Sequence, residues 1–104
     1  MAELIWTEPA ILDLDAVADY IELDNPPAAR RYIRHVFAKT AHLKKFPELG
    51  TAIPELDGLP MYRQLVLPPC RIFYKVADTR VFILHVMRCE QLLRMGKLFD
   101  SATE

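Results

Sequence analysis

Two amphipathic helical stretches joined by a very short link constrain this chain more than any other feature. Apolar residues recur every three or four positions over residues 10–21 and again over residues 29–43, which is the spacing of one helix face. Two prolines, Pro26 and Pro27, lie between them, and so short a link forces the two helices to pack antiparallel. The chain must therefore bury one face of a helical hairpin against another part of the fold.

Short β-strands account for most of the remaining pattern. Alternating or β-rich apolar runs cover residues 2–6, 61–67, 70–77 and 80–88. We expect an α+β protein of order β-α-α-β-β-β, with the N-terminal helical hairpin packed on one face of a small antiparallel sheet. Residues 48–60 combine glycines and prolines without periodicity and predict a loop. Residues 89–99 predict a short C-terminal helix or tail, and the other sheet face and the tail would be free for other proteins.

The ends of the predicted helices carry capping residues. Thr7 precedes the first helix and is expected to cap it, and Pro9 suits its first turn, where no amide donor is lost. Asn25 is expected to cap the second helix, and Pro47 stops it.

Length and composition predict a single domain, residues 1–104. Hydrophobic residues make up 52% of the chain and charged residues 26%, with a net charge of −1. This balance gives no reason to expect binding to a membrane or sequence-specific DNA binding by the chain alone. No segment resembles a signal peptide or a membrane span, so we expect a cytoplasmic protein. Cys70 and Cys89 are too few for a disulfide framework, and free thiols are expected in that compartment.

The charges of the two helices are segregated by sign. Residues 1–25 contain seven acidic side chains and no lysine or arginine, whereas residues 26–47 contain six basic side chains and no acid. One interpretation is that two solvated helix faces attract each other across the hairpin. The other is that the basic face also meets a polyanion or an acidic partner.

Polar residues of the last strands form the one cluster that could carry chemistry. The turn after residue 77 places Arg71 opposite the end of the last strand, with Arg63 on the neighbouring strand and His85 nearby. Arginines grouped in this way can bind phosphate or stabilise a phosphorane-like transition state, and a histidine can move a proton. Alternatively, the arginines flank the strands and the histidine is packed. No glycine-rich phosphate loop, metal-ligand spacing or nucleophile motif is present, so we expect no cofactor and no metal.

Five segments together resemble a known family. They are Ile5-Trp-Thr-Glu-Pro-Ala-Ile-Leu-Asp-Leu14, Val17-Ala-Asp-Tyr-Ile21, Asp24-Asn-Pro-Pro-Ala-Ala29, Phe46-Pro-Glu-Leu-Gly50 and Arg71-Ile-Phe-Tyr74. In this order they resemble the RelE/ParE superfamily of bacterial toxins, and most of all its ParE, or plasmid stabilisation, branch. The resemblance implies the toxin of a type II toxin–antitoxin module, which arrests growth and is held inactive by a cognate antitoxin.

The resemblance also implies partners and candidate binding residues. The antitoxin's C-terminal segment is expected to fill an apolar groove and often to extend the sheet, and an acidic segment would suit the second helix. The candidates for antitoxin binding are Arg30, Arg31, Tyr32, Arg34 and Phe37.

The two branches of the superfamily imply different targets. A ParE-like toxin inhibits DNA gyrase by protein–protein binding and has no hydrolytic site, so no catalytic residue is expected. The candidates for target binding are Arg71, Arg88, Leu92, Leu93, Arg94 and Leu98. The alternative is a RelE-like endoribonuclease that cuts mRNA on the ribosome, using Arg63, Arg71, His85 and Arg88. Residues 88–104 contain neither the tyrosine nor the histidine of that enzyme pattern, so gyrase inhibition is the first hypothesis.

Overall fold

A computed structural model of the chain describes residues 1–56 and 58–93. Its helices are α1 (Glu8–Glu22) and α2 (Pro26–Ala41), and two short 3-10 turns are η1 (His42–Lys44) and η2 (Pro54–Leu56). Its strands are β1 (Glu3–Trp6), β2 (Thr51–Ala52), β3 (Tyr62–Leu67), β4 (Cys70–Ala77) and β5 (Arg80–Arg88). The predicted α+β order is confirmed, with β2 and η2 added inside the segment that was predicted to be a plain loop.

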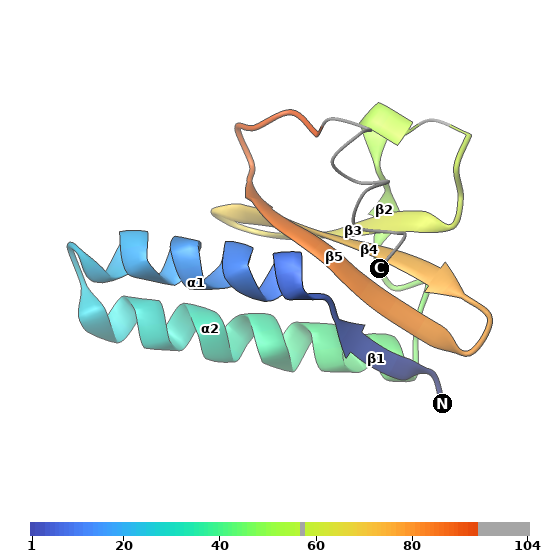
Figure 1. Cartoon of the computed structure of the whole chain (residues 1–104), viewed down its shortest axis with the longest axis horizontal. Helices are drawn as coiled ribbons and strands as arrows, with labels where there is room; N and C mark the ends of the chain where they lie inside the picture. The colour runs from blue at the N-terminus through green and yellow to red at the C-terminus, as the bar shows by residue number, and fades with distance from the viewer. Residues whose placement is uncertain (57, 94–104) are drawn as a thin grey trace.

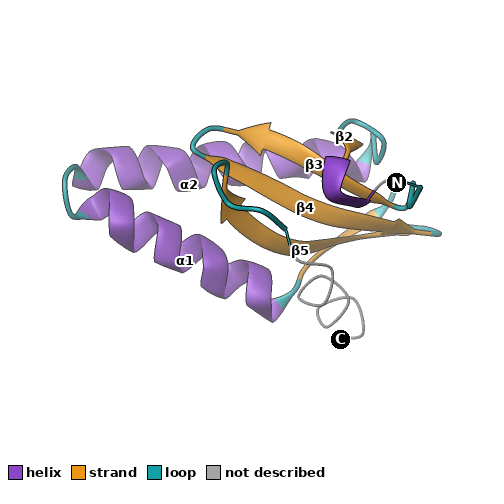
Figure 2. Cartoon of the chain, turned by 90° about the horizontal axis from the view of Figure 1, so that it is seen from above, coloured by secondary structure: helices purple, strands orange, loops and turns teal. Residues whose placement is uncertain are grey.

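The two helices lie side by side beneath the sheet, and the segment between β2 and β3 lies above it (Figure 1). Seen from above, α2 runs behind β3 and β4, while α1 runs beside β5 (Figure 2). The hairpin is therefore packed on one sheet face, as predicted. No helix within residues 1–56 and 58–93 is long and apolar enough to cross a lipid bilayer.

The sheet is mixed, whereas an antiparallel sheet was predicted. Its strand order is β1-β5-β4-β3-β2, and β1 pairs in parallel with the first half of β5. The other neighbours are antiparallel. A parallel partner is reached through a long crossover, here the whole helical hairpin and the strands after it. The partner of β1 is thus set by the packing of the helices and not by its own four residues.

Apolar residues fill the space between the hairpin and the sheet. This helix-side core joins α1, α2 and the inward face of the strands, and its fully buried members include Ala10, Val36, Leu43, Ile72, Tyr74, Val81 and Ile83. Burying a single such aliphatic side chain stabilises a fold by about 1.5–3 kcal/mol. The hairpin therefore depends on the sheet for most of its stability.

The opposite sheet face is covered, so the expectation that it is free was wrong. A second core joins Phe73, Leu84 and Met87 of the sheet to Ile53, Leu56 and Leu93. Prolines and glycines in residues 48–60 interrupt the spacing of the apolar residues that anchor this segment. The segment therefore showed no periodicity and was predicted to be a plain loop.

Of the two predicted helix caps, the structure confirms one and not the other. Asn25 caps α2 as expected, because its Oδ1 accepts a hydrogen bond from the Ala28 amide at 3.1 Å. Thr7 lies at the N-cap of α1, but its hydroxyl donates to the Ile83 carbonyl at 2.7 Å. Thr7 therefore ties the start of α1 to β5, and the predicted side-chain cap was wrong. The predicted C-terminal helix falls mostly on residues 94–104, outside the described residues, and residues 89–93 form no helix.

Candidate functional site

Arg71, the central candidate of the sequence, is buried in a network of hydrogen bonds. Its guanidinium forms a bidentate ion pair with Glu55, with nitrogen–oxygen distances of 2.6 and 2.9 Å. Its Nε donates to the side-chain oxygen of Gln64 at 2.9 Å, and Nη1 also donates to the Gln91 carbonyl at 3.1 Å. The guanidinium carbon lies 4.8 Å from the centre of the Phe73 ring. Arg71 is thus held on every side by the chain itself.

The Glu55–Arg71 ion pair connects three segments that are distant in sequence. Glu55 lies on η2, Arg71 on β4, and the Leu93 amide donates to Glu55 Oε2 at 3.0 Å. The two side chains are 19% and 10% exposed, so water weakens the interaction little. The pair therefore holds η2 and residues 91–93 over the sheet, next to the second core.

The Glu55–Arg71 pair predicts a specific dependence of stability on pH. Arg71 and the Leu93 amide lower the pKa of the Glu55 carboxyl from 4.5 to about 2. Since the folded pKa is depressed, the stabilisation is complete above pH 4.5 and is lost as the pH falls toward 2. We expect the free energy of unfolding to fall by about 2–3 kcal/mol over this range from Glu55 alone. Urea unfolding of the wild type and of Glu55→Gln between pH 2 and 5 measures it. The free energy of unfolding of the variant should depend less on pH than that of the wild type. Parallel pH profiles would show that Glu55 is not the source of the dependence.

Arg63 lies on the other sheet face and bonds main-chain carbonyls. Its side chain lies on the same face of β3 as those of Leu65 and Leu67, which face the hairpin. Its Nε and Nη2 donate to the Gly50 carbonyl at 3.1 and 2.8 Å. Nη2 also donates to the Glu48 carbonyl at 3.2 Å. Arg63 therefore fixes the segment that follows η1.

Tyr74 completes this anchor of residues 47–50. Its hydroxyl accepts a hydrogen bond from the Gly50 amide at 2.9 Å and donates to the Pro47 carbonyl at 2.7 Å. The ring is fully buried, and burial raises the pKa of Tyr74. Arg63 and Tyr74 together satisfy the main chain of a segment that has little secondary structure of its own.

His85 is packed inside the protein and bonded to α1. It is 4% exposed, and its Nδ1 lies 2.7 Å from Asp13 Oδ2. The same carboxylate oxygen accepts the Val86 amide at 3.1 Å. Because β1 pairs with β5 only as far as Ile83, Asp13 takes the place of a neighbouring strand beyond that point. The pair joins α1 to β5.

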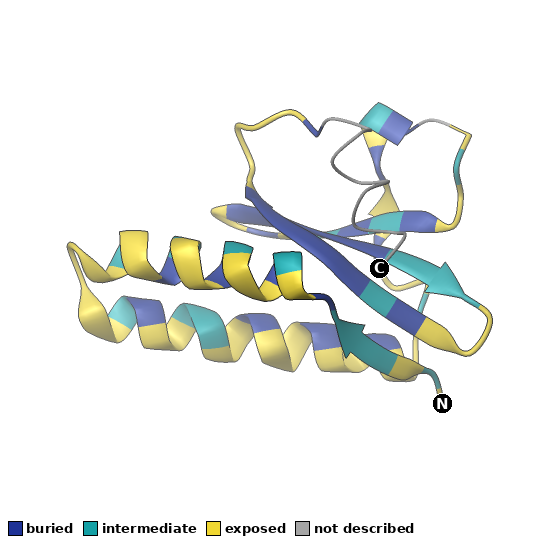
Figure 3. Ribbon diagram, in the orientation of Figure 1, coloured by how far each residue is buried: buried dark blue, intermediate teal, exposed yellow. Residues whose placement is uncertain are grey.

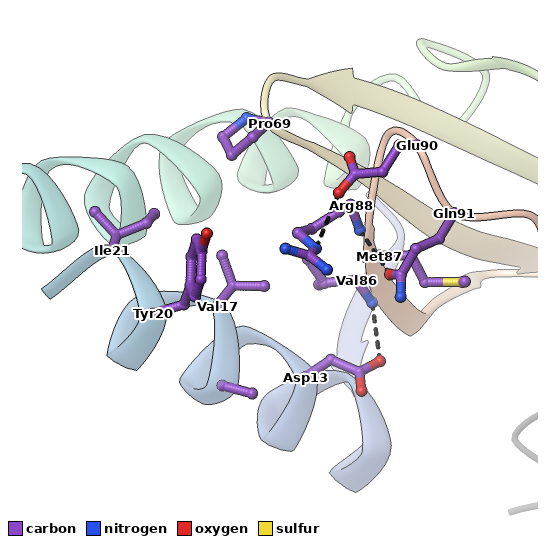
Figure 4. Close-up of a pocket in the computed structure, with 11 residues that line it drawn as sticks. Asp13, Val17, Tyr20, Ile21, Pro69, Val86, Met87, Arg88, Glu90 and Gln91 are labelled. Atoms are coloured by element: carbon purple, nitrogen blue, oxygen red, sulfur yellow. Dashed lines mark hydrogen bonds and ion pairs between the residues drawn. The ribbon is translucent and has the colours of Figure 1, made fainter. Parts of the chain in front are cut away.

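Arg88 is the exposed member of the predicted cluster. It lines a cleft of about 620 Å³ between α1 and the end of β5, together with Tyr20 and Glu90 (Figure 4). Its guanidinium carbon is 5.5 Å from the centre of the Tyr20 ring, and its Nε is 3.1 Å from Glu90 Oε1. An arginine over a tyrosine ring at a cleft is typical of residues that dominate protein–protein interfaces.

The candidate target-binding residues of the tail differ in exposure. Leu92 is 79% exposed, whereas Leu93 is 6% exposed and belongs to the second core. Arg94 and Leu98 lie outside the described residues. Leu92 can therefore contact a partner directly, while Leu93 supports the fold.

The candidate antitoxin-binding residues of α2 also differ in exposure. Arg30, Arg31 and Arg34 are exposed. Phe37 is 46% exposed, and its ring centre lies 5.1 Å from that of Trp6. Tyr32 is partly buried and its hydroxyl donates to the Leu67 carbonyl at 2.7 Å. Tyr32 is thus a structural residue, and the arginines form an exposed surface.

The two cysteines are free thiols in different environments. Cys70 is buried and Cys89 is exposed. Burial raises the pKa of Tyr32 above its usual range, and a hydrogen bond with Cys70 adds to this effect. Burial likewise raises the pKa of the Cys70 thiol, which makes it a poor nucleophile.

The structure does not bring the four residues of the nuclease hypothesis together. Arg63 and Arg88 lie on the hairpin side of the sheet, Arg71 lies on the opposite side, and His85 is bonded to α1. Glu55 and Asp13, the acidic partners of Arg71 and His85, were not identified from the sequence. Asp13 is one of several acids on α1, and Glu55 is one of three acids in residues 48–60, so no local pattern separates either from a solvated carboxylate.

Two comparisons define the class of protein to which this fold and site belong. A solved structure described as "Chromosomal ParDE TA system from P. aeruginosa" superimposes with a TM-score of 0.72 and 27% sequence identity, over 86% of this chain and 98% of that one. The curated protein "Toxin RelE2" of Caulobacter vibrioides is 34% identical over 92 residues, 88% of this chain and all of its own length. The fold is that of the RelE/ParE toxin superfamily.

The family follows from a third comparison. Residues 4–93 match the family described as the ParE toxin of the type II toxin–antitoxin system parDE. This chain therefore belongs to the ParE toxin family of type II toxin–antitoxin systems.

Proposed function

We propose that this toxin inhibits DNA gyrase by protein–protein binding and has no hydrolytic activity of its own. The observation that carries the proposal is the state of Arg71, whose donors are taken up by Glu55, Gln64 and Gln91. A catalytic cation must be aimed at the charge that develops on the reacting group. In this fold the Glu55 carboxylate already neutralises the guanidinium.

The competing hypothesis is ribosome-dependent cleavage of mRNA. It requires Arg63, Arg71, His85 and Arg88 to act on one phosphate, but these residues bond to different parts of the chain on both sides of the sheet. Proton transfer by His85 would also require access, and its side chain is 5% exposed. These facts favour inhibition by binding over hydrolysis.

The Tyr20–Arg88 cleft and the adjacent Leu92 are the target-binding surface in this proposal. Arg88→Glu and Leu92→Asp are each expected to raise the concentration needed for half-inhibition of gyrase about tenfold or more, since truncated hot-spot residues cost about 2 kcal/mol or more. A supercoiling assay with purified gyrase measures this. Arg80→Glu is the matched control, because Arg80 is also exposed and ion-paired, with Glu3, at the other end of β5.

A ribosome-programmed mRNA cleavage assay run beside it separates the two hypotheses. Gyrase inhibition without cleavage supports the proposal. Cleavage of ribosome-bound mRNA that is lost in Arg88→Glu, with gyrase unaffected, would assign the nuclease function instead.

A cognate antitoxin is the second partner in this proposal. The solved relative is described as a ParDE toxin–antitoxin system, and this chain carries an exposed basic surface formed by Arg30, Arg31 and Arg34. An acidic antitoxin segment complements that surface, and Phe37 lies beside it as an apolar contact.

A further inference from the structure

The outer side of α1 carries a row of four carboxylates. Glu8, Asp15, Asp19 and Glu22 follow one another at intervals of seven, four and three residues, which places them along one side of a helix. All four are exposed. Since α1 contains no lysine or arginine, none of them has a cation one helical turn away on its own helix.

The outer side of α2 carries the opposite charge. Arg30, Arg31 and Arg34 are exposed, and α2 contains no acidic residue. The ion pairs in the described part of the chain join Glu3, Asp13, Glu55 and Glu90 to residues of β4 and β5, so neither row takes part in them. The attraction across the hairpin that the sequence suggested therefore produces no direct ion pair there.

The two rows lie beside each other on one surface. The helices pack antiparallel on the same sheet face, and their exposed sides point away from it (Figure 3). Packed helices lie about 8–10 Å apart, so the acidic and basic rows are separated by about that distance. Exposed apolar side chains accompany the rows: Leu12 is 60%, Leu23 82% and Phe37 46% exposed.

We propose that this hairpin face binds a second copy of the chain. A two-fold axis parallel to the helices places α1 of each copy over α2 of the other, so each acidic row meets a basic row. The link between the helices brings Asp19 and Glu22 to the same end of the hairpin as Arg30 and Arg34. That rotation superimposes these two groups of opposite charge, and Leu23 and Phe37 supply apolar contact.

A nucleic acid fits this face less well. A polyanion on the basic row would lie about 10 Å from the acidic row, within the screening distance at 0.1 M salt. It would be repelled by the four carboxylates that attract a second copy. The same hairpin on another copy carries rows of both signs and is attracted to both helices, and the acidic antitoxin segment proposed above would compete with that copy for the arginines.

The size of the face sets the strength of the dimer. Helices of 15 and 16 residues are about 23 Å long, so the pair presents roughly 450 Å² per copy. Stable complexes bury about 800 Å² per partner. The dimer is therefore weak, forms at high protein concentration and dissociates with added salt.

Sedimentation velocity of the full chain tests the proposal with two charge-reversed variants. One carries Arg30→Glu, Arg31→Glu and Arg34→Glu, and the other carries Asp15→Lys, Asp19→Lys and Glu22→Lys. Each variant alone should dissociate at least tenfold more readily than the wild type in low salt, because its two rows then have the same sign. A one-to-one mixture should restore association as a heterodimer, and circular dichroism of each variant verifies its fold.

Three results would overturn the proposal. The first is a wild type that stays monomeric at several hundred micromolar in low salt. The second is a mixture of the two variants that associates no better than either variant alone. The third is a wild type that binds duplex DNA through the arginines without dimerising, which would assign the basic row to nucleic acid.

Discussion

Replacing Arg71 with leucine is expected to lower the free energy of unfolding by about 3–5 kcal/mol. The substitution leaves the Glu55 carboxylate and the Gln64 side chain without their partner in a largely buried site, and this is the costly way to break an ion pair. Urea unfolding at neutral pH measures the loss. The double variant Arg71→Leu/Glu55→Leu should recover much of it, because no uncompensated charge remains.

The matched control for Arg71 is an exposed arginine. Arg80 pairs with Glu3 at 3.4 Å, and both side chains are more than half exposed, so Arg80→Leu should cost less than about 1 kcal/mol. If Arg71→Leu changed the stability as little as Arg80→Leu while abolishing toxicity, Arg71 would be a functional group and not a structural one.

Replacing Gly50 with alanine is expected to destabilise the fold by about 3 kcal/mol. The added Cβ would lie 2.7 Å from the Tyr74 hydroxyl oxygen and closer still to the Gln64 carbonyl oxygen. Both atoms belong to packed strands, so neither can move away without disturbing the sheet. Thermal unfolding followed by circular dichroism measures the loss.

Gly58 supplies the contrast for this substitution. A Cβ at Gly58 meets no atom within 4 Å, but the residue has a φ of 85°. Gly58→Ala should therefore cost only about 1 kcal/mol, from the left-handed backbone alone. Equal losses at both glycines would show that the contact with Tyr74 is not the cause at Gly50.

The parts of the fold that follow from local periodicity could be predicted from the sequence. The helical hairpin, its Pro-Pro link and the strands around Arg71 are encoded by residues near one another in the chain, and their boundaries agree to within a few residues. The pairing of β1 with β5 joins residues about 77 positions apart, and no local pattern specifies it.

The β2 strand and the η2 turn between η1 and β3 could not be predicted for a similar reason. Arg63, on the strand that follows, and Tyr74, on β4, form hydrogen bonds with the main chain of this segment, and Arg71 of β4 holds its η2 turn. The local sequence shows glycines and prolines among acidic and apolar residues without periodicity, which is common in loops.

Arg63 and Arg71 were predicted to lie together because their strands are neighbours. They lie apart because successive side chains of a strand point to opposite faces of the sheet. Tyr62 and Gln64 share the face of Arg71, so Arg63 must point to the hairpin side. This period of two was visible in the sequence, and combining it with the register of β3 and β4 would have placed the two arginines apart. The buried Asp13–His85 contact carried no comparable signal, because Asp13 belongs to a helix rich in acids.

The two borders of the sheet differ in whether another strand can be added. β1 occupies one border as far as Ile83, and further along β5 Asp13 accepts a hydrogen bond from the Val86 amide. On the other border, β2 covers Arg63 and Gln64, which leaves the end of β3 from Leu65 without a neighbouring strand in the described part of the chain. Growth of the sheet, in a complex or in an aggregate, is therefore directed to the exposed Val66 side.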